Sequence, residues 1–195
     1  MFKAVLPIEG MATITEAGWA TLYLPFAASV PEGVTAYTIT DVENGALVKE
    51  EVTGVIPSNT GVLLKGDAGE YVFEEAEEPE PIEANLLIGT AADEGETFNE
   101  PGFKYYILAN DAENGIGFYF QKDTNGKSAF CGQYKAVLVL PEKTDAIGFR
   151  LDGATMIEAV EAPADDALIY DLTGRRVQDA ASGIYIVNGK KVLVK

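Results

Sequence analysis

The sequence predicts an all-β protein, built as an antiparallel β-sandwich or as two small sandwiches in series, with a C-terminal hairpin. Three observations lead to this fold class. Apolar, β-branched and aromatic residues gather in short runs, and turn residues separate these runs. In addition, no window of about a dozen residues keeps the apolar period of about 3.6 residues that an amphipathic helix needs. Short strands bury their apolar faces by packing in two layers, which favours a sandwich.

The apolar runs give the expected elements in chain order. The predicted strands are Thr13–Thr15, Trp19–Phe26, Val34–Thr40, Leu47–Val52, Gly61–Lys65, Tyr71–Glu74, Lys104–Ala109, Ile116–Gln121, Lys135–Leu140, Gly148–Leu151, Leu168–Leu172, Ile184–Val187 and Lys190–Lys195. Turn signals such as Pro31-Glu-Gly33 and Asn125-Gly126 lie between them. The segment Pro81–Leu87 has room for one helical turn.

The chain closes with a hairpin signal. Asn188-Gly189 stands between two apolar-rich runs, and this dipeptide readily adopts the two positive φ angles of a type I′ turn. The turn predicts that Val187 pairs with Lys190 and that Tyr185 pairs with Val192. Apolar residues occur on both faces of this hairpin, and an isolated hairpin is marginally stable at best. We therefore expect it to lie inside a larger β layer.

Two acidic segments resemble each other and predict hairpin loops. Asp41-Val-Glu-Asn-Gly45 and Asp111-Ala-Glu-Asn-Gly115 each precede an apolar run, and each is expected to close through a left-handed glycine. Weak calcium binding is the functional alternative, also at Asp123-Thr-Asn125-Gly126. These loops lack the spaced ligands and the closing bidentate Glu of an EF-hand, so we predict no metal site.

Charge restricts the partners. The formal net charge is −17, which makes nucleic acid and anionic membrane surfaces unfavourable partners. In residues 171–195 five basic side chains outnumber two acidic ones, giving +3 and leaving −20 for residues 1–170. No transmembrane segment is expected either, because the most apolar stretch, Trp19–Val30, is short and contains Pro25.

The residue inventory also restricts the chemistry. The chain has no histidine and one cysteine, Cys131, so Ser-His-Asp and Cys-His nucleophiles and zinc clusters are excluded. Cys131 is expected to be a buried small hydrophobe. No glycine-rich phosphate loop precedes a helix, and no cofactor or catalytic residue is predicted. Among the 31 carboxylates nothing singles out an acid–base pair, which leaves a glycoside hydrolase as the least favoured function.

Two segments read as connections. Glu74–Glu83 is dense in carboxylates and contains two prolines, which predicts a solvated loop at a sheet edge. Ala159–Asp166 has the small, acidic, proline-containing composition of a linker. The expected domains are therefore an all-β module over residues 1–158, followed by a linker and a β tail over residues 159–195.

Aromatic residues are the candidates for ligand binding. Trp19 and Tyr23 lie on one face of their predicted strand, and Tyr119 lies on the face opposite Phe118 and Phe120. If exposed, Trp19, Tyr23 and Tyr119 would form a platform for a carbohydrate. The competing interpretation places these aromatics in the core, where most strand aromatics pack.

The C-terminal segment carries the most specific pattern. A strand leads into a Gly turn with paired arginines, and a Gly-started strand and a basic terminal strand follow. Its residues are Tyr170, Asp171, Leu172, Gly174, Arg175, Arg176, Gly183, Tyr185, Val187, Gly189, Lys190 and Lys191. This pattern resembles the sorting segment of surface and secreted proteins of the Bacteroidetes, the type associated with type IX secretion. The resemblance implies that secretion or anchoring machinery recognises the folded tail.

The body resembles a module that commonly precedes such tails, through Ala17–Phe26, Pro31–Tyr37, Val55–Gly66 and Tyr134–Pro141. That module has no recognised catalytic residues. The resemblance therefore implies a non-catalytic module, adhesive or a spacer, at the outer-membrane surface or outside the cell. A carbohydrate-binding accessory module is the alternative, and a surface protein is a further possible partner.

Overall fold

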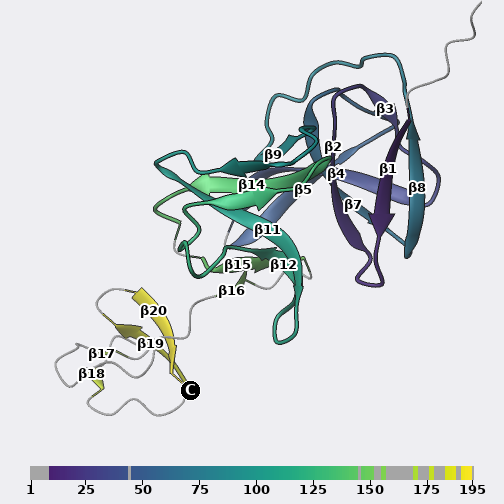
Figure 1. Cartoon of the computed structure of the whole chain (residues 1–195). Coiled ribbons are helices and arrows are strands. Elements are labelled where there is room, and N and C mark those ends of the chain that lie inside the picture. The colour runs from purple at the N-terminus through teal and green to yellow at the C-terminus, as the bar shows by residue number, and fades with distance from the viewer. Residues whose placement is uncertain are drawn as a thin grey trace, which may run out of the picture. The chain divides into compact units, whose positions relative to one another are not determined.

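A computed structural model describes residues 9–43, 45–144 and 146–151, together with the strands at 155–156, 169–170, 176–177, 183–187 and 190–194. The described residues form antiparallel β-sheets and contain no helix, which confirms the predicted fold class (Figure 1). Within this part of the chain, accordingly, no helix has the length and apolarity to cross a bilayer.

The strands of the first half are β1 (Glu9–Ile14), β2 (Trp19–Leu24), β3 (Ala28–Ser29), β4 (Val34–Glu43), β5 (Ala46–Val52), β6 (Val55–Ile56), β7 (Thr60–Gly66), β8 (Gly69–Glu74) and β9 (Leu87–Thr90). Those that follow are β10 (Glu96–Phe98), β11 (Phe103–Asp111), β12 (Gly115–Tyr119), β13 (Ala129–Cys131), β14 (Lys135–Pro141) and β15 (Gly148–Arg150). The last are β16 (Thr155–Met156), β17 (Ile169–Tyr170), β18 (Arg176–Val177), β19 (Gly183–Val187) and β20 (Lys190–Val194).

The chain divides into two compact units. One comprises Met1–Thr144 and Gly148–Thr155, and the other comprises Asp145–Ile147 and Met156–Lys195. The second unit contains a four-stranded sheet of order β18-β17-β19-β20. The domain boundary predicted between residues 158 and 159 falls outside the described residues and stays a prediction.

The terminal hairpin has the predicted register. Val187 pairs with Lys190 and Tyr185 pairs with Val192, in antiparallel strands β19 and β20. Strand β17 pairs with the other edge of β19, so the hairpin lies inside a larger sheet, as expected. Asn188 and Gly189 themselves lie outside the described residues.

The first half of the larger unit is a small sandwich. A four-stranded sheet of order β2-β7-β4-β5 forms one layer, and the ribbons β1–β8 and β3–β6 contribute to the opposite side of its core. The buried residues that join them are Ala12, Ile14, Ala20, Leu22, Leu24, Ala28, Ala36, Val52, Ile56, Val62, Leu64 and Phe73. Each strand of the sheet contributes alternate residues, because strand side chains point to opposite faces.

The second half is built around another sheet, of order β16-β15-β12-β11-β14-β9. The ribbon β10–β13 packs on one face of it through a second core of Tyr105, Ala129, Cys131 and Val137. On the other face of the same strands, Tyr106 and Leu138 are fully buried. The Tyr106 ring meets the Phe149 ring edge-on, with 5.3 Å between centroids.

The two sheets contact each other where β2 and β7 meet β9 and β14. The Ala136 N–H donates a hydrogen bond to Thr21 Oγ1 at 3.1 Å, and the Tyr23 N–H donates one to the Tyr134 carbonyl at 3.1 Å. Thr21 and Leu63 share the face of the first sheet that looks away from the first core, and both are buried. Strand β7 is therefore covered on both sides, which explains its continuous apolar run instead of an alternating one.

One predicted element is wrong. Residues 81–87 form no helical turn, and Leu87 begins strand β9. Their direction is set by Asn85, whose Nδ2 donates to the Gly61 carbonyl at 2.8 Å and whose Oδ1 accepts the Leu87 N–H at 3.0 Å. Hydrogen bonds to another strand thus replace the bonds that a helical turn would make within the segment.

Candidate functional site

The three aromatic residues proposed as a platform occupy different surroundings. Trp19 and Tyr23 lie on the same face of β2, whereas Tyr119 lies on β12 in the other sheet, and all three are half-buried. The Tyr119 hydroxyl donates to the Gly115 carbonyl at 2.8 Å and thereby closes its own hairpin. The Tyr23 hydroxyl donates to Asn59 Oδ1 at 3.3 Å. The platform stays a prediction, and Trp19 has the surroundings best suited to it.

The sheet register explains the surroundings of Trp19. Trp19 pairs with Lys65 of β7, and Lys65 pairs with Thr35 of β4. Two residues further along β4 is Tyr37, on the same face. Residues directly opposite each other in a sheet share a face, so Trp19, Lys65 and Tyr37 project together. The Trp19 and Tyr37 rings lie 6.3 Å apart at an interplanar angle of 43°.

A second lysine reaches Trp19 from the far edge of the sheet. Lys49 of β5 pairs with Ile39 of β4, which places it on the same face. The ammonium Nζ of Lys49 lies 5.2 Å from the Trp19 ring centroid, and that of Lys65 lies 5.4 Å from it. Both distances fit cation–π attraction. We call Trp19, Tyr37, Lys49 and Lys65 the Trp19 cluster.

Electrostatics distinguish the two lysines. Burial lowers the pKa of Lys49 below its ordinary value, and the positive charge of Lys65 lowers this pKa further. Lys49 is half-buried, whereas Lys65 is exposed. Glu51, which pairs with Tyr37, is an exposed carboxylate on this face. The cluster is thus a half-covered aromatic ring held beside two like charges.

No motif in the sequence indicates this cluster. Lys49 and Lys65 are ordinary strand residues with no motif around them, and each is far from Trp19 along the chain. Only the pairing of β2 with β7, of β7 with β4 and of β4 with β5 brings them together. To predict the cluster from the sequence, one would have had to know the register of all four strands.

Tyr134 is a further residue that sequence reasoning missed. Its φ angle is 58°, which is unusual for a bulky residue, and 37% of its surface is exposed. Its N–H donates to the Thr90 carbonyl at 2.8 Å, and its carbonyl accepts the Tyr23 N–H. These two backbone bonds hold β14 against β9 and β2, so the contact between the sheets accounts for the strained conformation.

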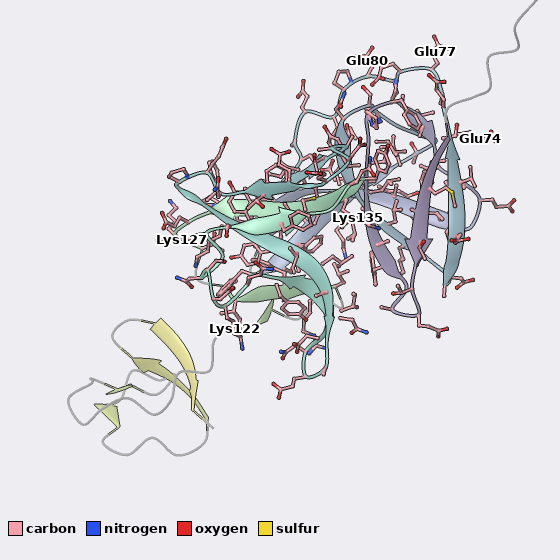
Figure 2. All side chains as sticks on the ribbon, viewed as in Figure 1. Glu74, Glu77, Glu80, Lys122, Lys127 and Lys135 are labelled. Atoms are coloured by element: carbon pink, nitrogen blue, oxygen red, sulfur yellow. The ribbon has the colours of Figure 1, made fainter. Side chains whose placement is uncertain are left out.

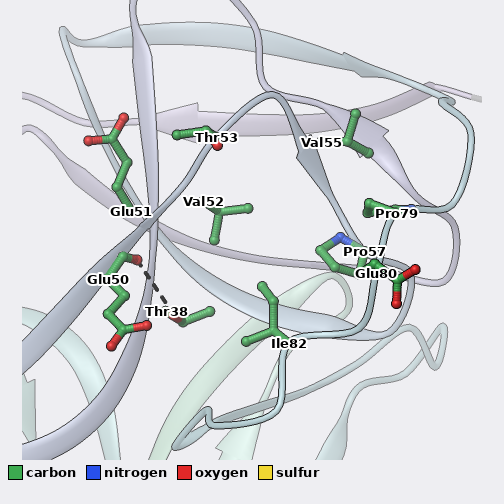
Figure 3. Close-up of a pocket in the computed structure, with 10 residues that line it drawn as sticks. All are labelled: Thr38, Glu50, Glu51, Val52, Thr53, Val55, Pro57, Pro79, Glu80 and Ile82. Atoms are coloured by element: carbon green, nitrogen blue, oxygen red, sulfur yellow. Dashed lines mark hydrogen bonds between the residues drawn. The ribbon is translucent and has the colours of Figure 1, made fainter.

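A shallow hollow lies between β5 and the loop after β8 (Figure 3). It has a volume of about 290 Å³, and its lining residues are Thr38, Glu50, Glu51, Val52, Thr53, Val55, Pro57, Pro79, Glu80 and Ile82. The Thr38 hydroxyl donates to the Glu50 carbonyl at 3.5 Å, while the three glutamates are exposed. An apolar floor with a solvated acidic rim offers contact surface for a cationic group, and we assign no reaction to it.

The acidic loop after β8 is solvated at the sheet edge, as predicted. Figure 2 shows Glu74, Glu77 and Glu80 along this segment. All glutamates of Glu74–Glu83 are exposed. The loop is attached to the body where the Ala76 N–H donates to the Ala27 carbonyl at 2.8 Å and Ile82 packs on the first core.

The acidic hairpin loops close through left-handed glycines, as predicted, with φ of 78° at Gly45 and 76° at Gly115. In the second loop, Asp111 Oδ1 accepts the N–H groups of Glu113 and Asn114 at 3.1 and 2.9 Å. These backbone hydrogen bonds lower the pKa of Asp111. The carboxylate is therefore used to shape the turn. Across the described residues, no three acidic or thiol side chains group as metal ligands.

Cys131 is buried in the second core, as predicted. Its Sγ donates to the Lys135 carbonyl at 3.1 Å, and burial raises the pKa of the thiol to about 11. Because the thiolate is the reactive form, we expect the folded protein to react with a disulfide reagent at least ~100-fold more slowly than the urea-unfolded chain at mildly alkaline pH. Absorbance of the released thiol measures both rates, and equal rates would contradict the burial.

For the sorting-like residues, the structure describes backbone positions only. Tyr170 lies in β17, Arg176 in β18, Gly183, Tyr185 and Val187 in β19, and Lys190 and Lys191 in β20. Asp171, Leu172, Gly174, Arg175 and Gly189 lie outside the described residues. Their role in sorting stays a prediction.

Comparison with known proteins identifies no relative. No family model, no curated protein and no solved structure matches this chain.

Proposed function

We propose that this protein is a non-catalytic β module of a bacterial cell-surface or secreted protein, with an adhesive or spacer role, and that its C-terminal segment serves sorting or attachment. The observation that supports this proposal is the second compact unit, Asp145–Ile147 and Met156–Lys195, with its own four-stranded sheet. A tail that folds apart from the body can be recognised by export machinery without any change in the body.

The charge distribution also supports a separate role for the tail. The last 25 residues, 171–195, carry +3 on a chain whose other residues carry −20. Strands β19 and β20 pair in the register that the Asn188-Gly189 turn demands. A short basic sheet within an acidic chain presents a receptor with a distinct surface.

Cell fractionation tests the proposal. The chain would be expressed in a Bacteroidetes host with an active type IX pathway. Protease digestion of intact cells would measure how much of the protein is exposed on the surface. We expect deletion of residues 169–195 to abolish surface exposure and to leave the protein on the inner side of the outer membrane. Circular dichroism of the purified deletion variant would check that the body remains folded.

A charge-matched pair of variants sharpens the test. Changing Arg175 and Arg176 to Glu alters the tail, and changing Lys122 and Lys127 to Glu alters the body by the same charge. Lys122 and Lys127 are exposed, and a surface ion pair such as that of Lys127 with Glu142 contributes little to stability, so their replacement should leave folding intact. We expect the first variant alone to lose surface exposure. Normal display of the truncated chain would refute the sorting role.

A further inference from the structure

The Trp19 cluster concentrates positive charge on an acidic protein. The chain has 14 basic and 31 acidic residues, so positive charge is scarce in it. Yet two ammonium groups converge on one indole ring, at 5.2 and 5.4 Å from its centroid. Among the described residues, no carboxylate lies within 4.0 Å of the ammonium group of Lys49 or Lys65. The ion pair that the described residues do form joins Lys127 to Glu142.

This arrangement favours an anion. A hydrogen bond between an ammonium group and an anion is stronger than a cation–π contact at an exposed site. An arriving anion therefore draws the flexible Lys49 and Lys65 chains from the ring. It also relieves the repulsion that the two ammonium groups exert on each other in the free protein.

The two aromatic rings of the cluster restrict the shape of the uncharged part of the ligand. When the lysines turn toward an anion, the Trp19 face is freed next to Tyr37, whose ring is tilted by 43° to it. Two angled aromatic rings suit a small ligand with a flat apolar face and polar edges, which is the shape of a pyranose ring. A long polyanion fits poorly, since beyond the cluster it would meet Glu51 and the other carboxylates of residues 1–170, whose net charge is −20.

We propose that the Trp19 cluster binds a short acidic saccharide, a pyranose carrying a carboxylate or a sulfate. Lys49 and Lys65 pair with the anionic group, and Trp19 and Tyr37 contact the sugar ring. This site goes beyond the proposed sorting and adhesive role, and its test is independent of export. Failure of binding would leave the sorting proposal standing, and failure of sorting would leave this one standing.

The chain reports on the site by its own fluorescence, because Trp19 is its single tryptophan. The purified full chain would be titrated with digalacturonic acid and with a sulfated galactose, and binding would be confirmed by calorimetry. We expect a saturable change in Trp19 emission with both acidic sugars. The methyl ester of digalacturonic acid, which lacks the charge, should cause none.

Matched variants assign the binding to the two lysines. Lys49→Met and Lys65→Met should each weaken binding about tenfold or more, which corresponds to the loss of one charge-assisted hydrogen bond. Lys143→Met removes the same charge from an exposed position elsewhere and should leave the affinity unchanged. Glu51→Gln removes the carboxylate on the same face and should strengthen binding.

Three outcomes would overturn the proposal. The first is the absence of a saturable change with either acidic sugar. The second is equal weakening by Lys143→Met and Lys49→Met, which would mean that only net charge matters. The third is binding of hexaglutamate as tight as that of digalacturonic acid, which would identify the cluster as a site for acidic peptides. Unchanged unfolding midpoints would show that the variants are folded.

Discussion

We expect the Gly89→Ala variant to lose about 3 kcal/mol of unfolding free energy, because the sheets leave no room for an added methyl group. A Cβ atom at Gly89 would lie 2.5 Å from the Lys135 carbonyl oxygen and 2.6 Å from the Tyr23 Cβ. Both atoms are fixed to the backbone of neighbouring strands. The clash therefore cannot be relieved by turning a side chain, and β9 must move away from β2 or β14.

Urea and thermal unfolding, followed by Trp19 fluorescence, measure this effect in the unit that contains Gly89. For a chain of this size a loss of 3 kcal/mol lowers the melting temperature by about 6–12 °C. Gly132→Ala is the matched control, because its added Cβ would have Lys135 Cγ at 3.8 Å as its nearest neighbour. We expect the control to change stability by less than about 0.5 kcal/mol. A Gly89→Ala protein as stable as the control would contradict the close approach.

The second large effect is expected at Asn85, whose side chain joins three backbone segments. Its Nδ2 donates to the Gly61 carbonyl at 2.8 Å, and its Oδ1 accepts the N–H groups of Leu87 and Ile39 at 3.0 and 3.4 Å. Asn85→Ala leaves these partly buried groups without a protein partner. We expect a loss of about 2–3 kcal/mol in the free energy of unfolding.

Asn85→Asp removes the hydrogen-bond donor of the Asn85 side chain and keeps its acceptor. Its carboxylate still accepts from Leu87 but faces the Gly61 carbonyl, which raises the pKa of the new carboxyl group in the folded state. A raised folded-state pKa favours folding at low pH and loses that advantage as the pH rises. The deficit of Asn85→Asp relative to the wild type should therefore shrink from neutral to mildly acidic pH.

Asn110→Ala is the control for both Asn85 variants, since Asn110 is exposed on β11. Its unfolding free energy should stay within about 0.5 kcal/mol of the wild type. Denaturant unfolding at each pH, with all variants compared with the wild type at that pH, removes the contribution of the other carboxylates. A deficit of Asn85→Asp that grows on acidification would contradict the assigned donor.

Local signals in the sequence predicted the hairpins correctly. The register of β19 and β20 follows from one dipeptide, Asn188-Gly189, and the loops ending at Gly45 and Gly115 close as expected. These features depend on the backbone preferences of a few adjacent residues, which do not change with the surrounding fold. For the same reason, the solvated loop Glu74–Glu83 could be predicted from its charges and prolines alone.

Strand β9 shows where local signals fail. Its four residues, Leu87–Thr90, are few and include Gly89, so the sequence suggested a helical turn nearby and no strand. The strand exists because it pairs with β14, and Asn85 ties its start to Gly61 of β7. The strands β3, β6, β10 and β13 were missed for the same reason, since two or three residues carry no periodic pattern of their own.

The same distinction between local signals and long-range contacts applies to the residues of the candidate site. Trp19 could be nominated from the sequence, because an aromatic residue on a predicted strand has only a core position or a binding surface open to it. Its partners Tyr37, Lys49 and Lys65 could not be nominated, because each belongs to a different strand and is unremarkable in its own neighbourhood.

By itself the sequence determined the all-β class, the turns and the opposite net charges of residues 1–170 and 171–195, because each depends on composition or on adjacent residues. Only the tertiary structure decided which strands pair and which faces are covered on both sides. It alone placed two lysines on one tryptophan. Those features depend on contacts between residues distant in the chain, and the energy of such contacts exists only after the strands have assembled.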